Sequence, residues 1–268
     1  MNPIRLKKHS RLGATILCGL FLSFFNPTTT TAAVKEKATH IHHLTLRGAY
    51  SELPSSSLDL TSLVLGGGLS SKSYFKLVDH IDGLAKAKEI DYLVLDLSQP
   101  FLLSRVQRRD FSQRMAKLKE AGIKTIAWVG SVDTATLCVA SACDEIFMSS
   151  DGMVDIPSAT MAHTFYKDLF NLVGVNVMAI RAGDFKGAVE PFTRSSMSVH
   201  LRKHYEILLT SMNDAAVAQI AAGRKLPRKT VRELQQNRLM LPATAMKHGL
   251  IDKLVEPGRM REAIAARI

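Results

Sequence analysis

The sequence predicts an α/β domain built around a parallel β-sheet. Three short apolar runs, at 92–97, 124–129 and 145–149, are bounded by charged or turn residues, which is typical of strands buried on both faces. Stretches with the 3.6-residue periodicity of amphipathic helices separate these runs. Alternating strands and helices of this kind form parallel sheets with right-handed crossovers. With 46% hydrophobic and 22% charged residues among 268, the chain can build a large core, which excludes a disordered protein.

Each element follows from a local pattern along the chain. Residues 40–48 alternate in polarity, as in a half-exposed strand, and residues 74–88 carry apolar side chains at helical spacing. We expect strands at 40–48, 92–97, 124–129, 145–149 and 176–181. We expect helices at 74–88, 107–121, 134–142, 164–173 and 199–222.

Glycines mark the boundaries of several elements. Gly122, Gly174 and Gly223 directly follow predicted helices, where a glycine commonly ends the helix. The glycine triad at 66–68 lies well beyond the first strand and matches neither the dinucleotide-binding pattern nor the phosphate loop. We therefore expect the triad to be a loop and not a nucleotide site.

The first 33 residues have the organisation of a secretory signal peptide or a short N-terminal anchor. A basic segment at 1–11 precedes an apolar segment at 12–25, which is shorter than a membrane-spanning helix requires. Export with cleavage near Ala33 is the favoured interpretation, and an uncleaved anchor is the alternative. We expect residues 34–268 to form a single domain, located in the periplasm or on the periplasmic side of the cytoplasmic membrane.

The charge of the chain argues against nucleic acid as a partner. The formal net charge is +11, and four of the basic residues lie in the predicted leader. The others are spread over predicted helices, without interleaved aromatic residues and without a known DNA-binding pattern. We interpret this charge as solvated helix faces that could lie near an anionic membrane surface.

Histidines give only weak evidence for a metal site. His40 and His42 share one face of a predicted strand beside His43, and His200 and His204 lie one turn apart on a predicted helix. Neither group has an accompanying carboxylate pattern, so exposed histidines are the favoured interpretation. We expect no metal and no other cofactor.

The segment GDFKGAVEPFTRSSMS, residues 183–198, contains the strongest candidate for chemistry. Gly183 and Gly187 flank Lys186 in a predicted loop that follows a strand. A lysine can act as a general base when burial disfavours its charged form. Taken alone, an ordinary solvated lysine is the commoner interpretation.

This segment resembles the G-x-[YF]-K-[SG]-A-x-E-P-[FY]-x-R-x-x-M-S segment of the signal peptide peptidase A (SppA) family. Three further segments, VASACDEIFMSSDGMV, FYKDLFNLVGVNV and RLMLPATAMKHGLIDKLV, resemble others of that family in the same order. The resemblance covers residues 40–256 and implies a ClpP/crotonase-like fold of stacked β-β-α units. It also implies a serine-type peptidase with a serine nucleophile and a lysine base.

The resemblance assigns the base to Lys186 but leaves the nucleophile in doubt. Thr134 stands at the place of the family's serine, and its extra methyl group would crowd the attack. Pro100 stands in a segment whose glycine amide helps to bind the oxyanion in catalytic members, and a proline has no N–H. Glu190 and Arg194 are expected to position the lysine loop, or else to form a plain surface ion pair.

These features resemble the N-terminal half of the long, two-half family members. The resemblance therefore implies an envelope serine endopeptidase in which this chain supplies Lys186. The serine would come from a second domain or chain, in a homo- or hetero-oligomer with a serine-bearing SppA-like chain. The expected substrates are signal peptides or other hydrophobic peptides. The alternative is a catalytically inactive scaffold or regulatory subunit, and an acyl-CoA enzyme of the same fold lacks the residues that it would need.

Overall fold

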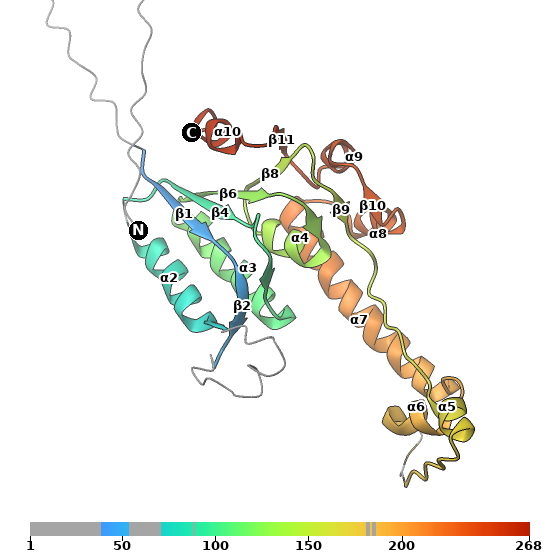
Figure 1. The fold of residues 1–268 in the computed structure, drawn as a ribbon. Coiled ribbons are helices and arrows are strands. Elements are labelled where there is room, and N and C mark those ends of the chain that lie inside the picture. The colour runs from blue at the N-terminus through green and yellow to red at the C-terminus, as the bar shows by residue number, and fades with distance from the viewer. Residues whose placement is uncertain (1–38, 54–70, 88, 181–182, 184–185) are drawn as a thin grey trace, which may run out of the picture.

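Five strands form a fully parallel sheet in the order β1-β4-β6-β8-β11 (Figure 1). They are β1 (Ile41–Thr45), β4 (Tyr92–Asp96), β6 (Lys124–Val129), β8 (Glu145–Ser149) and β11 (Lys253–Val255). The computed structural model describes residues 39–53, 71–87, 89–180, 183 and 186–268. The central strands β4, β6 and β8 are buried on both faces, which explains why they are continuous apolar runs in the sequence.

A short strand follows each of the first four long strands and belongs to a second layer of small sheets. These strands are β2 (Gly48–Ser51), β5 (Phe101–Leu102), β7 (Val132–Asp133) and β9 (Val154–Asp155). The small sheets have the orders β3-β2-β5 and β10-β9-β7, with β3 at Lys72–Ser73 and β10 at Leu239–Met240.

A helix completes three of these units. The helices are α2 (Tyr74–Lys86), α3 (Arg105–Glu120) and α4 (Thr134–Ala140). The repeat of long strand, short strand and helix is the stacked β-β-α architecture that the family resemblance implies. The predicted fold class is therefore confirmed.

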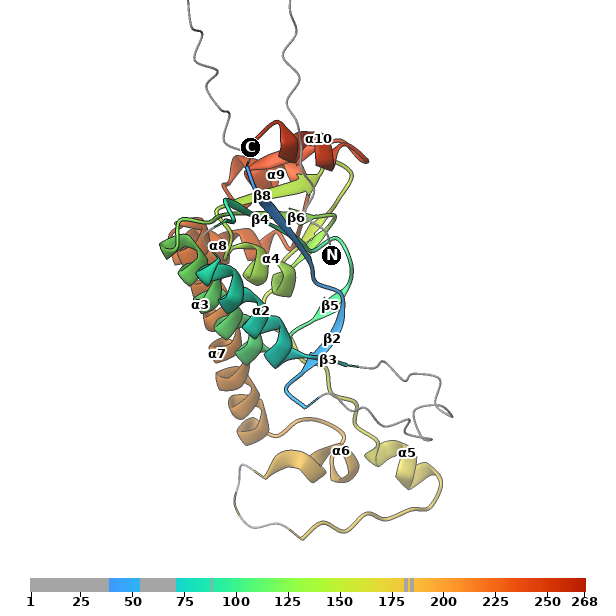
Figure 2. The same ribbon diagram turned by 90° about the vertical axis from the view of Figure 1, so that its left-hand side faces the viewer.

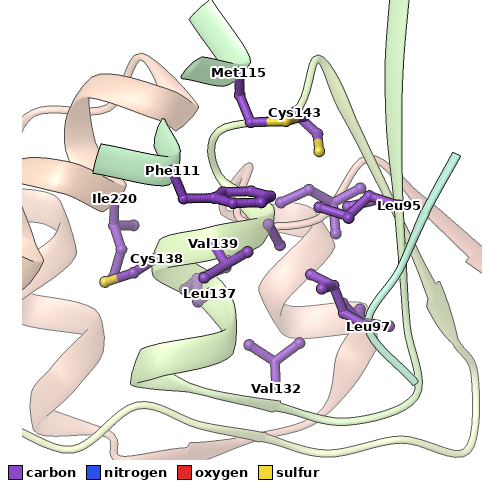
Figure 3. Close-up of a cluster of buried hydrophobic side chains, with 14 of the residues drawn as sticks. Leu95, Leu97, Phe111, Met115, Val132, Leu137, Cys138, Val139, Cys143 and Ile220 are labelled. Atoms are coloured by element: carbon purple, nitrogen blue, oxygen red, sulfur yellow. The ribbon is translucent and has the colours of Figure 1, made fainter. Parts of the chain in front are cut away.

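The main core lies between the sheet and the helices α2, α3, α4 and α7. Figure 3 shows the ring of Phe111 among side chains from the sheet and from α4, including Leu95 and Val139. A capping box at Ser104 and Gln107 fixes the start of α3. The opposite face of the sheet packs against α10 (Met260–Ala265) through a smaller apolar cluster that includes Phe147.

The long helix α7 (Val199–Arg224) joins the core to a projecting arm. Its C-terminal half buries Val217 and Ile220, and α8 (Arg228–Gln236) and α9 (Pro242–Lys247) follow it. Gly223 was predicted to end this helix, but the helix continues to Arg224 and Lys225 takes the left-handed conformation with φ 54°. Gly223 serves packing instead, since an added Cβ would collide with the backbone of Ser141 after α4.

The arm consists of the chain from Ile156 to the N-terminal half of α7. After β9 the chain runs beside α7 to α5 (Lys167–Leu172), and then returns through η1 (Gly187–Val189) and α6 (Glu190–Thr193) (Figures 1 and 2). No residue of α5 is buried. The arm thus extends away from the sheet, with few of its side chains in a core.

One predicted strand is wrong, and two further predictions concern residues outside the described ranges. Residues 176–180 of the strand predicted at 176–181 have no regular structure, and none of the sheets among the described residues includes them. The predicted helix at 164–173 is shortened to α5. The leader predicted at 1–33 and the glycine triad at 66–68 lie outside the described residues, so both stay predictions.

Within the part of the chain that is described, no helix is long and apolar enough to cross a membrane.

Candidate functional site

Lys186 lies on the arm at the start of η1. Its backbone N–H donates to the carbonyl oxygen of Gly183 at 3.5 Å, and Gly183 has φ 93°, a conformation that favours glycine. Gly187 packs directly on Leu201 of α7, so closely that an added Cβ would clash with the leucine side chain. The backbone conformation at Gly183 and the close packing at Gly187 thus explain why glycines stand at these two positions. The Lys186 side chain remains exposed.

Glu190 holds the lysine segment against the start of α7. Its carboxylate is 1% exposed and accepts hydrogen bonds from the Ser198 backbone N–H at 2.9 Å and hydroxyl at 2.6 Å. The Ser198 hydroxyl also caps α7 by accepting from the Leu201 N–H. Arg194, half-exposed, lies 4.0 Å from the same carboxylate. Glu190 thus ties its own segment to the start of α7, whereas Arg194 contributes a weak ion pair at the surface. The role of both residues in positioning the lysine loop stays a prediction.

Further contacts fix α5 against α6. The backbone N–H of Tyr166 donates to the carbonyl of Pro191 at 2.6 Å, and the Ser195 hydroxyl donates to Asp168 at 2.7 Å. The rings of Tyr166, Phe170 and Phe192 lie 6.0–6.4 Å apart, with two of the three pairs stacked. These contacts give the arm an internal structure of its own around the segment that begins at Lys186.

Thr134 is the first residue of α4. It belongs to the part of the protein formed by the main sheet and the helices packed on it, which we call the sheet domain. Its hydroxyl donates to the carbonyl of Pro157 at 3.3 Å, and the residue is half-buried. In both Figure 1 and Figure 2, α4 lies beside the sheet while α6 lies at the far end of the arm. The chain therefore does not bring the candidate base and the residue at the nucleophile position together.

The surroundings of Thr134 are poorly suited to an oxyanion. Asp133 caps α4 by accepting from the Thr136 N–H at 2.6 Å, which places a carboxylate at the helix N-terminus. Pro100 offers only its carbonyl, which accepts from Gly48 at 2.8 Å. A negative charge that develops beside Thr134 would meet the negative charge of Asp133.

Two features near the candidate residues were not predicted from the sequence, namely the Asp133 cap and the pairing of Ser198 with Glu190. An aspartate directly before the small-residue helix is a recognisable cap, so a search for N-cap residues could have found Asp133. The pairing of Ser198 with Glu190 depends on how α6 folds back onto α7. The sequence carries no local signal for that pairing.

The described surface carries a hollow away from both candidate residues. A hollow of about 520 Å³ along α7 is lined by Glu206, Ile207, Thr210, Ser211 and Asp214, and by neither Lys186 nor Thr134. Across the described ranges, no three histidine, cysteine or acidic side chains gather as a site with three protein ligands would require. Cys138 and Cys143 are buried free thiols whose pKa values burial raises, to about 11 and about 12.

Comparison with known proteins identifies a family and two related sequences. The profile of Peptidase family S49 matches residues 117–266, more than half of the chain. Protease 4 of Haemophilus influenzae is 28% identical over 160 residues, which are 59% of this chain and 26% of that protein. Protease 4 of Salmonella typhi is 27% identical over 135 residues, 50% of this chain and 22% of that protein. The match spans about a quarter of the length of these relatives.

Solved structures with a similar arrangement have low sequence identity. A membrane-bound stomatin-specific protease is 13% identical with a TM-score of 0.46, covering 84% of this chain and 83% of the other. An enoyl-CoA hydratase/isomerase family protein from Silicibacter pomeroyi is 14% identical with a TM-score of 0.43, covering 72% and 68%. Since both TM-scores are below 0.5, the fold assignment rests on the strand order and the repeated β-β-α units.

Proposed function

Since the chain belongs to peptidase family S49, within which it resembles the SppA enzymes, we propose that it is the lysine-bearing part of a serine-type endopeptidase. Lys186 is the general base, and the serine nucleophile comes from a second domain or chain. The substrates are extended hydrophobic peptides, such as cleaved signal peptides.

The observation that carries this proposal is the position of Lys186. The residue is exposed on the arm, whereas the helix that begins at Thr134 lies beside the sheet. A lysine works as a base only when its neutral form is accessible, and removal from water favours that form. Something outside the described chain must therefore cover Lys186 in the active state.

The apolar surface of the arm supports a partner that would provide this cover. Large hydrophobic side chains are exposed along it, namely Met161, Tyr166, Leu169, Leu172, Val173, Val175, Val177, Met178, Ile180, Phe192, Val199, Ile207 and Leu208. An exposed apolar surface of this extent is typical of a protein–protein interface. We propose that a serine-bearing SppA-like domain or chain, or a second copy of this chain, packs on it.

The local chemistry at α4 supports a serine supplied from elsewhere. The Thr134 hydroxyl is engaged with Pro157, and the Asp133 carboxylate occupies the helix N-terminus. Neither group leaves a favourable place for a tetrahedral oxyanion. The same observations favour a second candidate function, a non-catalytic scaffold of the same family, which the experiment below separates from the first.

In the proposed reaction, the neutral Nζ of Lys186 accepts the proton of the partner serine as its Oγ attacks the peptide carbonyl carbon. The lysine then gives that proton to the leaving amine as the C–N bond breaks, leaving an acyl-serine. A water molecule attacks the acyl group while Lys186 takes the water's proton, which it returns to the serine when the acid leaves. Lys186 ends each cycle neutral.

The leader predicted at 1–33 favours an envelope location. Export would place the arm where cleaved signal peptides accumulate, near the periplasmic side of the membrane. The excess of basic residues agrees with a position close to anionic lipids.

The test uses the native complex, isolated through this chain from envelope extracts. Its serine nucleophiles are labelled with a fluorophosphonate, and its cleavage of a hydrophobic peptide is followed directly. We expect Lys186→Ala to abolish cleavage with an unchanged circular dichroism spectrum. The matched control is Lys167→Ala, an exposed lysine of the same arm, which we expect to leave cleavage intact.

The outcomes separate the alternatives. A labelled partner with cleavage that depends on Lys186 supports the split site. Label on Thr134 of this chain would mean a self-contained site and contradict the proposal. A stable complex without label or cleavage would favour the scaffold.

A further inference from the structure

Two histidines that are distant in sequence meet at the edge of the main sheet. The Nε2 atoms of His42, on β1, and His80, on α2, lie 2.9 Å apart. Their ring centroids are 4.9 Å apart, with 49° between the ring planes. Because the atoms in closest contact are the two Nε2 atoms, both imidazoles direct a potential metal-binding atom at the same point.

The contact between His42 and His80 follows from the alternation of side chains along β1 and from the packing of α2. On β1, His42 shares its face with Leu44, which packs against the main core on the side of α2. His43 faces the opposite side with Ile41, which packs toward the α10 cluster. Pairing of His42 with Leu93 of β4 fixes the register of the strand. His42 therefore faces α2 as a consequence of the same pattern that buries the core.

The position of α2 is equally well determined. Leu77, Val78, Ile81 and Leu84 anchor the helix in the core, and the Ser73 hydroxyl caps its start. His80 lies beside Ile81 at the border of this buried stripe, and its side chain remains exposed. The pair is thus held by rigid elements on both sides and is open to a solute ion on one side.

Two Nε2 atoms at hydrogen-bond distance share one hydrogen, and a metal ion can replace it. Zinc binds imidazole nitrogen at about 2.0–2.1 Å, so two nitrogens of a tetrahedral site lie about 3.3 Å apart. To reach that geometry the rings would need to separate by about 0.4 Å and to turn so that both Nε2 lone pairs point at the ion. Nitrogen ligands of this kind suit Zn²⁺, Cu²⁺ and Ni²⁺.

We propose that His42 and His80 bind a divalent transition-metal ion, Zn²⁺ or a chemically similar ion, across the seam between β1 and α2. Within the described ranges no third histidine, cysteine or acidic residue completes the group, so water would fill the remaining positions. The bound ion links an edge strand to a helix, and therefore stabilises the folded domain.

The test is a titration of the full chain, without a polyhistidine tag and after treatment with a chelator, with Zn²⁺ at neutral pH. Calorimetry should show one saturable site, and thermal unfolding should show a higher Tm with Zn²⁺. We expect His80→Ala to weaken binding on the order of tenfold or more, equivalent to about 1.4 kcal/mol. The same substitution should remove the zinc-dependent rise in Tm.

Two control variants make the assignment specific. His43→Ala removes a neighbouring histidine from the opposite face of the strand and should leave binding unchanged. His204→Ala disrupts the i, i+4 histidine pair on α7 and should also leave it unchanged. Since His80 is exposed on a helix, His80→Ala should fold even if His42→Ala does not.

Three results would overturn the proposal. They are the absence of saturable Zn²⁺ binding by the unaltered chain, undiminished binding by His80→Ala, and loss of binding in His204→Ala with His80→Ala unaffected.

Discussion

The sheet domain and the arm differ in how completely they bury their apolar residues. In the domain, Phe111, Ile126 and Phe147 are fully buried. On the arm, Leu172, Met178 and Ile180 are 83%, 90% and 97% exposed. The domain therefore accounts for its own stability, whereas the arm presents apolar surface that a partner can cover.

The difference matters because Lys186 belongs to the incomplete part. The sheet domain carries the position of the family's nucleophile, at Thr134, and the arm carries the candidate base. The surroundings of a core residue are set by the domain itself, whereas the surroundings of an arm residue depend on the partner that covers the arm. The comparison predicts that core substitutions act on stability and arm substitutions act on assembly.

The largest effect is expected for truncation of the core. Phe111→Ala should destabilise the protein by about 3–5 kcal/mol, because it leaves a cavity between α3, α4 and the sheet. Leu172→Ala on the arm should change the free energy of unfolding by less than about 0.5 kcal/mol. Denaturant unfolding of both variants measures the contrast. Equal losses would mean that the arm is part of the cooperative core.

The same glycine-to-alanine change should have opposite effects in two helices. Gly223→Ala on α7 should destabilise by about 1–3 kcal/mol, since the new methyl group meets the Ser141 backbone. Gly83→Ala on α2 should stabilise by about 0.4–1 kcal/mol, because nothing lies within 4 Å of the added Cβ. Thermal unfolding distinguishes the two. A neutral Gly223→Ala would show that α7 does not pack on α4 this closely.

Loss of the buried Glu190 carboxylate should loosen the arm and spare the domain. Glu190→Ala removes the acceptor for the Ser198 N–H and hydroxyl, at a local cost of about 1–3 kcal/mol. Hydrogen exchange at the start of α7 should accelerate, while exchange in the central strands stays unchanged. Glu190→Gln retains an acceptor and should show a smaller effect. Faster exchange throughout the sheet would argue against an independent arm.

The smallest effect is the pH dependence that arises from His42. Its pKa in the folded state lies below the usual 6.5, through burial and then through His80 and His43. The unfolded chain therefore binds more protons, so stability is full above about pH 6.5 and falls as the pH drops toward the folded pKa. In metal-free buffer, His42→Gln should flatten this slope, and an unchanged slope would assign it to other groups.

Sequence reasoning located the domain better than the arm. The central strands at 92–97, 124–129 and 145–149 were found within one residue, because burial on both faces leaves a continuous apolar run. The strands β5, β7 and β9 have only two residues each and no readable period. The prediction of a strand at 176–181 was wrong for residues 176–180. An apolar segment does not form a strand unless a neighbouring strand pairs with it.

The surroundings of the candidate residues could not be predicted from the sequence. The segment around Lys186 could be recognised from its residues, but the hydrogen bonds between Glu190 and Ser198 could not. The exposure of Lys186 and its separation from Thr134 depend on where the arm projects. The contact between His42 and His80 joins residues 38 positions apart, which no local pattern reveals.

The most direct test of the split site is to map what lies next to position 186 in the native complex. Lys186→Cys would carry a thiol-linked photo-crosslinker, with Lys167→Cys as the control, and isotopic labels would separate contacts within one molecule from contacts between molecules. Cys138 and Cys143 are buried and should not react. We predict a cross-link to a serine at a helix N-terminus of another domain or chain. Cross-links only to Thr134 and its neighbours in the same molecule would contradict the account.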